Sequence, residues 1–167
     1  MDVEDFIKDL VKLYADQKGL LQNYYDSLFA LIEINVAKKV GNEMGNKLVT
    51  EIRNIMPGEV ETLNITYSLL QKYAFMRLEQ LINVENPPSN CKFIPPKRLL
   101  RINATEILNN MIKGELCVTE SLRKIGRSLN NTEIIKTFTD LVIIHEKYLV
   151  RLRRLWDEVA SMGEEII

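Results

Sequence analysis

The chain has 167 residues, of which 46% are hydrophobic and 27% charged, and its formal net charge is −1. This length and composition are typical of one folded domain with a hydrophobic core, and they exclude an intrinsically disordered chain. Because 22 basic residues are balanced by 23 acidic ones, the molecule has no overall field for nucleic acid. Any contact with nucleic acid is therefore expected to be indirect or through a local basic patch.

The N-terminal half shows helical periodicity almost without interruption, and we find no strand-like alternation. The apolar spacing predicts a helix from residue 3 to Lys18-Gly19, a second over 20–40, and a continuing helical face up to Met56. Pro57-Gly58 is interpreted as a stop, and a further helix is expected over 58–83.

Residues 84–102 interrupt this pattern with four of the five prolines of the chain. Tandem prolines favour extended backbone, so this segment is interpreted as a long crossover. It separates an N-terminal helical lobe, 1–83, from a C-terminal helical hairpin, 103–167, and we expect the two to pack as one domain. The fold class is therefore predicted to be all-α, a bundle of five to six helices with one long Pro-rich crossover.

Two asparagines with a glutamate three residues later mark the starts of the last two helices, over 104–128 and 131–162. Asn103 and Asn130 are the expected N-caps, paired with Glu106 and Glu133. In the last helix one stripe recurs in steps of four and three: Ile134, Phe138, Leu141, His145, Tyr148, Leu152, Leu155 and Val159. Since His145 lies in the middle of this stripe, we interpret it as a packed residue between helices and not as a ligand or a base.

The sequence contains no nucleophile elbow, no glycine-rich phosphate loop and no Cys-x-x-Cys motif. It therefore predicts a non-catalytic protein, with no catalytic residue, no cofactor and no metal. The apolar runs are too short to cross a bilayer, and the acidic residues 2–5 differ from a secretory signal, so no membrane association and a cytoplasmic location are expected. Cys91 and Cys117 are then expected to be reduced thiols.

Two hairpins joined by a long crossover resemble ferritin-like and rubrerythrin-like bundles. That resemblance implies a di-metal site and oxidoreductase activity, to which Glu43, Glu115, His145 and Tyr148 would contribute. The sequence has His145-x-x-Tyr148 where that family has Glu-x-x-His, so a degenerate or absent di-metal site is expected.

The stretch Leu21-Gln-Asn-Tyr24-Tyr25 resembles the signature that opens a helix in GINS subunits, the helical assembly that tethers and activates the replicative helicase. Leu70 to Leu81, with Arg77, resembles a second element of that family, and the likeness covers roughly residues 5–125. GINS subunits usually add a small β-domain, whereas 126–167 has a helical pattern. The resemblance implies a DNA-replication factor that acts through helix–helix interfaces.

The leading hypothesis is thus a non-catalytic scaffold or assembly subunit, a homo- or hetero-oligomer with protein partners. The candidate interface residues are Tyr24, Tyr25, Phe29, Tyr73, Arg77, Leu81, Arg151 and Arg154. The basic clusters at 147–154 and 97–101 are interpreted as salt-bridged surface.

Overall fold

The computed structural model describes residues 2–33, 42–82, 89–96 and 103–163. In these ranges the chain forms five helices and no strand, which confirms the predicted all-α class. The helices are α1 (Val3–Glu33), α3 (Asn42–Ala74), α4 (Leu78–Ile82), α5 (Ala104–Arg127) and α6 (Thr132–Ser161). None of the helices in this part of the chain is both long and apolar enough to cross a membrane.

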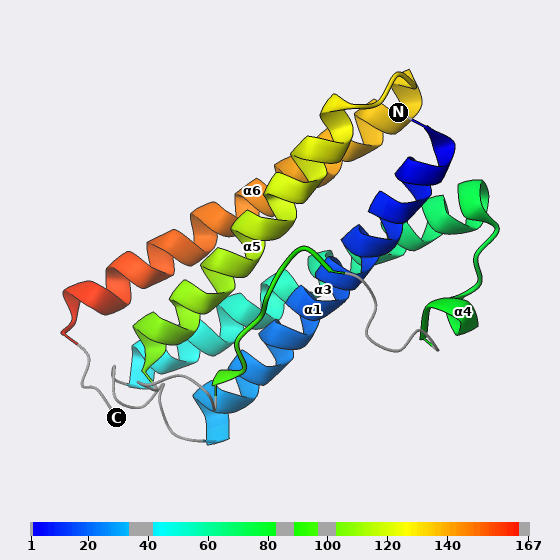
Figure 1. The fold of residues 1–167 in the computed structure, drawn as a ribbon. Helices are drawn as coiled ribbons and strands as arrows, with labels where there is room; N and C mark the ends of the chain where they lie inside the picture. Colours follow the sequence, from blue (N-terminus) through cyan, green and yellow to red (C-terminus); the bar gives the residue numbers. More distant parts are fainter. Residues whose placement is uncertain (1, 34–41, 83–88, 97–102, 164–167) are drawn as a thin grey trace.

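The four long helices lie side by side as a bundle, with α4 off to one side (Figure 1). α1 packs along α3, α5 packs along α6, and α1 also packs along α5. The seam between α3 and α6 has the lightest contact of the four. The molecule is therefore built from two helical hairpins whose apolar faces share one core.

Two predicted helix breaks are absent, because the chain stays helical through both of them. α1 continues through Gly19, and α3 continues through Pro57-Gly58. Both predictions were wrong because tertiary packing, and not local sequence, decides the structure at these positions. Each glycine lies where another part of the chain approaches the helix closely: Phe93 at Gly19 and Tyr148 at Gly58. Packing outweighs the weak helix propensity of glycine and the backbone hydrogen bond lost at Pro57.

The predicted helix over 58–83 is also wrong at its C-terminal end. α3 ends at Ala74, and Phe75 has a φ of 53°, in the left-handed region where helices commonly end. The chain turns there and resumes as the short α4. The apolar spacing alone does not reveal this turn, because the residue in the left-handed conformation is not the usual glycine.

The second hairpin matches its predicted bounds closely. The side chain of Asn103 accepts a hydrogen bond from the Glu106 N–H and caps α5 as expected. At α6 the cap is Asn131, which accepts from the Ile134 N–H, and not Asn130. The correction is one residue. Asn131 has Ile134 and not a glutamate three residues later, so the pattern of an asparagine followed by a glutamate points to the wrong neighbour, although both residues are asparagine.

Of the predicted crossover, 84–88 and 97–102 lie outside the described residues. Residues 89–96, which we call the strap, form no α-helix and run across α1 and α5 (Figure 1). Cys91 of the strap is joined to Cys117 of α5 by a disulfide. The prediction of two reduced thiols was therefore wrong, because residues 26 apart in sequence meet only through the folded crossover.

Candidate functional site

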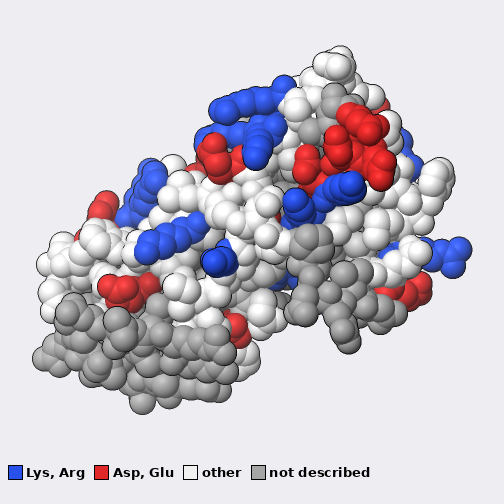
Figure 2. All heavy atoms as spheres, viewed as in Figure 1, with Lys and Arg blue, Asp and Glu red and all other residues white. Residues whose placement is uncertain are grey.

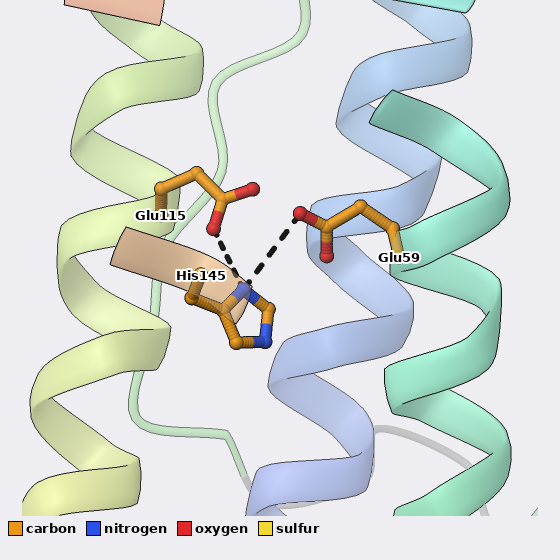
Figure 3. Close-up of side chains that lie close together, drawn as sticks. All are labelled: Glu59, Glu115 and His145. Carbon is orange, nitrogen blue, oxygen red and sulfur yellow. Dashed lines mark hydrogen bonds and ion pairs between the residues drawn. The ribbon is translucent and has the colours of Figure 1, made fainter. Parts of the chain in front are cut away.

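The central feature of the core is a cluster of three ionisable side chains from three helices. His145 of α6 has no exposed surface, and neither does Glu115 of α5, while Glu59 of α3 is 1% exposed. Figure 3 shows the three side chains pointing toward one another. Charged groups of this kind are almost never fully buried unless they are paired or bind an ion.

The contacts within the cluster centre on the imidazole of His145. Its Nδ1 lies 2.7 Å from Oε2 of Glu115 and 3.7 Å from Oε1 of Glu59. The first distance is a hydrogen bond, in which Nδ1–H donates to the carboxylate. The second is too long for one. His145 therefore donates to Glu115, and Glu59 receives no hydrogen bond from the imidazole.

Both carboxyl oxygens of Glu59 are buried and accept no hydrogen bond from a described residue, and Nε2 of His145 also lacks a partner among these residues. A buried polar group without a partner costs on the order of 1–3 kcal/mol. Native cores retain few such groups, and where they do, a functional role, a bound ion or a buried water molecule is the usual reason. Glu59 is thus the least satisfied member of the cluster.

The two carboxyl groups have opposite pKa shifts. Burial raises the pKa of Glu59 well above its ordinary value, and the negative charge of Glu115 and the hydrogen bond of the protonated Glu59 to that carboxylate raise it further. Burial alone would also raise the pKa of Glu115. It is nevertheless lowered, because the neighbouring Glu59 carboxyl, the His145 imidazole and the Tyr24 hydroxyl all stabilise its carboxylate. The cluster therefore holds a proton on Glu59 and a charge on Glu115.

Tyr24 of α1 completes the surroundings of Glu115, so that all four long helices contribute. Its hydroxyl donates a 2.7 Å hydrogen bond to Oε1 of Glu115, and the side chain is fully buried. Burial raises the pKa of Tyr24, and the neighbouring carboxyl groups of Glu115 and Glu59 add to that effect. The phenol therefore remains a hydrogen-bond donor, which fixes the orientation of Glu115.

The strap covers the seam between α1 and α5, beside Tyr24 and Glu115. The ring of Phe93 lies against both helices, since a Cβ at Gly19 would be 2.6 Å and one at Gly114 3.0 Å from that ring. The Ile94 carbonyl accepts hydrogen bonds from the side-chain amides of Asn23 and Asn110. The strap therefore packs against Gly19 and Gly114 and is hydrogen-bonded to Asn23 and Asn110.

Asp16 of α1 holds the start of the strap. Its Oδ1 accepts hydrogen bonds from the Asn90 and Cys91 backbone N–H groups, at 3.0 and 2.9 Å, and from the Ser89 hydroxyl. Together with the disulfide to Cys117, these bonds fix the strap to both helices. This side of the cluster is closed.

The seam between α3 and α6 has a different character. Three ion pairs cross it among the described residues: Lys47 to Glu158 at 2.8 Å, Glu51 to Arg151 at 3.2 Å and Lys72 to Glu133 at 3.9 Å. All three are at least partly exposed, so they mark a polar edge that faces solvent.

The three clustered residues offer two carboxylates and one imidazole, a donor set suited to a divalent first-row transition ion. One donor atom from each of Glu59, Glu115 and His145 lies within 4.8 Å of the others. Metal–ligand bonds of about 2.0–2.2 Å place donors of one ion on the order of 3 Å apart. Small side-chain rotations would convert the present hydrogen-bonded arrangement into such a site. Three protein ligands also leave a coordination position for water.

Sequence reasoning found two of these three residues. It named Glu115 and His145, and the prediction that His145 lies buried in the stripe of α6 is confirmed, with Leu149 in place of the half-buried Tyr148. Glu43 is exposed in the first turn of α3, about 24 Å along the helix from Glu59, so it does not join them.

The sequence pattern does not single out Glu59, because Pro57-Gly58 predicts a helix end beside it. The signal was present, since buried residues recur along α3 in steps of three and four. They are Ile52, Ile55, Glu59, Thr62, Thr66 and Leu70.

The predicted interface residues divide by exposure. Tyr24 and Leu81 are buried within the chain and are not available to a partner, whereas Tyr25 and Phe29 are exposed. Tyr73 packs edge-on against Phe6. Of the arginines, Arg77 and Arg154 are exposed, and Arg151 pairs with Glu51.

Basic side chains on the face in Figure 2 form several separate groups with acidic ones among them. At 147–154, Arg151 is salt-bridged as predicted. The cluster at 97–101 lies outside the described residues. This distribution offers no continuous basic surface on that face.

No family model, no curated protein and no solved structure matches this chain. The function therefore has to be argued from the site itself.

Proposed function

We propose that this protein is a helical bundle that binds one divalent transition-metal ion, Mn²⁺, Fe²⁺ or Zn²⁺, through Glu59, Glu115 and His145. The observation that carries the proposal is the carboxyl group of Glu59, which is buried beside the anionic Glu115 carboxylate with no described hydrogen-bond donor in reach of either oxygen. A cation between the three side chains would satisfy those oxygens and balance the buried negative charge.

This hypothesis replaces the sequence-based expectation of no metal. It is close to the ferritin-like alternative, although with one ion and with Glu59 in place of Glu43. Tyr24 and the packed core would serve as the surroundings that orient the ligands. Water at an open coordination position would make the site competent for metal-assisted chemistry, so the expectation of a non-catalytic protein also becomes a question for experiment.

Equilibrium dialysis of the purified chain against each ion, followed by elemental analysis, tests the proposal. We expect about one ion per chain. Glu115→Gln and His145→Ala should lose that ion, while Glu120→Gln, an exposed glutamate on the same helix as Glu115, should retain it. A wild-type chain that binds no ion, or a Glu115→Gln variant that binds as well as wild type, would refute the proposal.

An assembly subunit, including the GINS-like replication factor implied by the sequence, remains a second proposal. It is favoured by three exposed apolar side chains on one face of α1, at helical spacing: Tyr25 at 44%, Phe29 at 57% and Ile32 at 46%. If these residues bind a second copy or a protein partner, light scattering after size exclusion should show an oligomer or a complex. Phe29→Asp should then dissociate it, and a wild-type chain that is monomeric at every concentration and captures no partner would argue against it.

The cytoplasmic location expected from the acidic N-terminal residues stays a prediction. The Cys91–Cys117 disulfide favours an oxidising environment instead, since such bonds are rare in most cytosolic proteins. Alkylation of the protein directly in lysed cells, before any oxidation, would distinguish free thiols from the bonded pair.

A further inference from the structure

An ion that binds the buried cluster has to pass between two helices, and the four seams of the bundle are not equally closed. The α1–α5 seam is covered by the strap, with Phe93 on both helices and a disulfide beside it. The α1–α3 and α5–α6 seams lie within the two closely packed hairpins. These three seams have heavier packing between their helices than the fourth.

The α3–α6 seam is the remaining one, and it has the lightest packing. Its edge is lined by the Lys47–Glu158 and Glu51–Arg151 ion pairs, which are hydrated and can open at low cost. Glu59, whose carboxyl oxygens accept no hydrogen bond from a described residue, projects from α3 itself (Figure 3). The α3–α6 seam therefore has a polar, solvent-facing edge, and Glu59, the proposed metal ligand that accepts no hydrogen bond, projects from one of its helices.

One aromatic side chain lies in this seam at the level of the cluster. Tyr148 is on α6, one turn after His145, and its ring lies against Gly58, the neighbour of Glu59. The fit is close, since a Cβ at Gly58 would be 1.5 Å from the Tyr148 hydroxyl oxygen. Burial raises the pKa of Tyr148, and the nearby carboxyl groups of Glu59 and Glu115 raise it further, so the hydroxyl is within electrostatic range of both.

We propose that Tyr148 is the gate of the metal site, and that divalent cations enter and leave through the α3–α6 seam when its ring moves off Gly58. This inference rests on the proposed metal-binding function. The phenol ring is half-buried, so it has solvent on one side into which it can rotate. Gly58 is required at this position because any larger residue would displace the ring.

If Tyr148 is the gate, removing its ring should change the rates of metal association and dissociation. The equilibrium affinity for the metal should change little, because Tyr148 is not one of the three ligands. With Co²⁺ as a spectroscopic probe, association is measured by stopped-flow mixing and dissociation by transfer to excess EDTA. Tyr148→Ala should accelerate both processes by about tenfold. Tyr148→Phe retains the ring and should stay within about twofold of wild type.

Gly58→Ala should displace the Tyr148 ring through the added methyl group, and it should also accelerate both metal association and metal dissociation. The Gly58→Ala/Tyr148→Ala double variant should be no faster than Tyr148→Ala, because both changes open the same path. Phe93→Ala is the matched control, since it removes an aromatic cover from the opposite seam and should leave both rates unchanged.

The outcomes separate the two hypotheses. A wild-type chain that binds no Co²⁺ overturns the metal site and the gate together. A wild-type chain that binds Co²⁺ while Tyr148→Ala has unchanged rates overturns the gate alone. Faster exchange in Phe93→Ala and not in Tyr148→Ala would place the entrance at the strap instead.

Discussion

At the scale of single residues, the hydroxyl of Tyr24 determines how Glu115 is held. It is the donor to Oε1, while His145 is the donor to Oε2, so each oxygen of this carboxylate has one buried partner. Tyr24→Phe removes one donor and leaves the rest of the ring in place. We expect a loss of about 1–3 kcal/mol in the free energy of unfolding, measured by urea denaturation.

Tyr25→Phe is the control for this measurement, because the neighbouring tyrosine is exposed and should change stability by less than about 0.5 kcal/mol. If the two variants were equally stable, the hydrogen bond to Glu115 would not contribute as the geometry indicates.

Glu59 gives the metal-free protein an unusual dependence on pH. Its pKa is raised in the folded state, so below about pH 4.3, the ordinary value, it is neutral in both states and its burial costs least. As pH rises above that value the unfolded chain loses the proton while the folded chain retains it, and stability falls. Glu115 acts in the opposite direction: its lowered pKa contributes stability that is lost as pH falls below the ordinary value.

Glu59→Gln should therefore remove the decline in stability on the alkaline side. At pH 8, in the presence of a chelator, we expect this variant to be more stable than wild type by about 1–3 kcal/mol, with little difference at pH 4.5. Thermal melts at several pH values provide the measurement. If the melting temperatures of the two proteins changed with pH in parallel, Glu59 would not be a buried neutral acid.

The residues of the site were only partly accessible to sequence reasoning. His145 was placed correctly, because an unbroken stripe of apolar residues fixes the buried face of α6. Glu59 was not, since its helix contains a proline that usually ends one. The meeting of Glu59 with His145 depends on the register between α3 and α6, which no local pattern encodes.

At the scale of elements, the strap is the part of the fold that needs covalent support. It has no helix and a small apolar anchor, Phe93, so its attachment depends on Asp16, the two asparagines and the disulfide. Changing Cys91 and Cys117 together to serine should lower the free energy of unfolding by about 3–4 kcal/mol, the loop-closure contribution for a bridge across 26 residues.

Reduction of the wild-type protein with dithiothreitol provides an independent comparison. It should lower the wild-type melting temperature to that of the double serine variant and should leave the variant unaffected. A wild-type protein that is indifferent to reduction would mean that the strap is held without the bond.

The helices themselves were predictable where local signals agreed. Asn103 before Glu106 gave the start of α5 correctly, and the apolar stripe gave the length of α6 to within a residue or two. The failures at Gly19 and Gly58 share one cause: a glycine in the sequence signals either a break or a close approach. Only the partner, Phe93 or Tyr148, distinguishes the two.

At the scale of the whole molecule, binding of an ion to the folded state alone should stabilise the entire bundle, because the ligands come from three helices. At a free ion concentration of about 100 times Kd, the gain is about 2.7 kcal/mol. For a chain of this size it corresponds to an increase of roughly 5–10 °C in Tm. Glu115→Gln should show no increase, and an equal increase in that variant would indicate ions bound elsewhere on the surface.

The most direct test of the account is a crystal structure of the wild-type protein grown with Mn²⁺ or Zn²⁺, with anomalous diffraction used to locate the ion. The account predicts a single strong peak within the core, about 2.0–2.2 Å from an oxygen of Glu59, an oxygen of Glu115 and Nδ1 of His145. A core without such a peak at saturating metal, with His145 still hydrogen-bonded to Glu115, would contradict it.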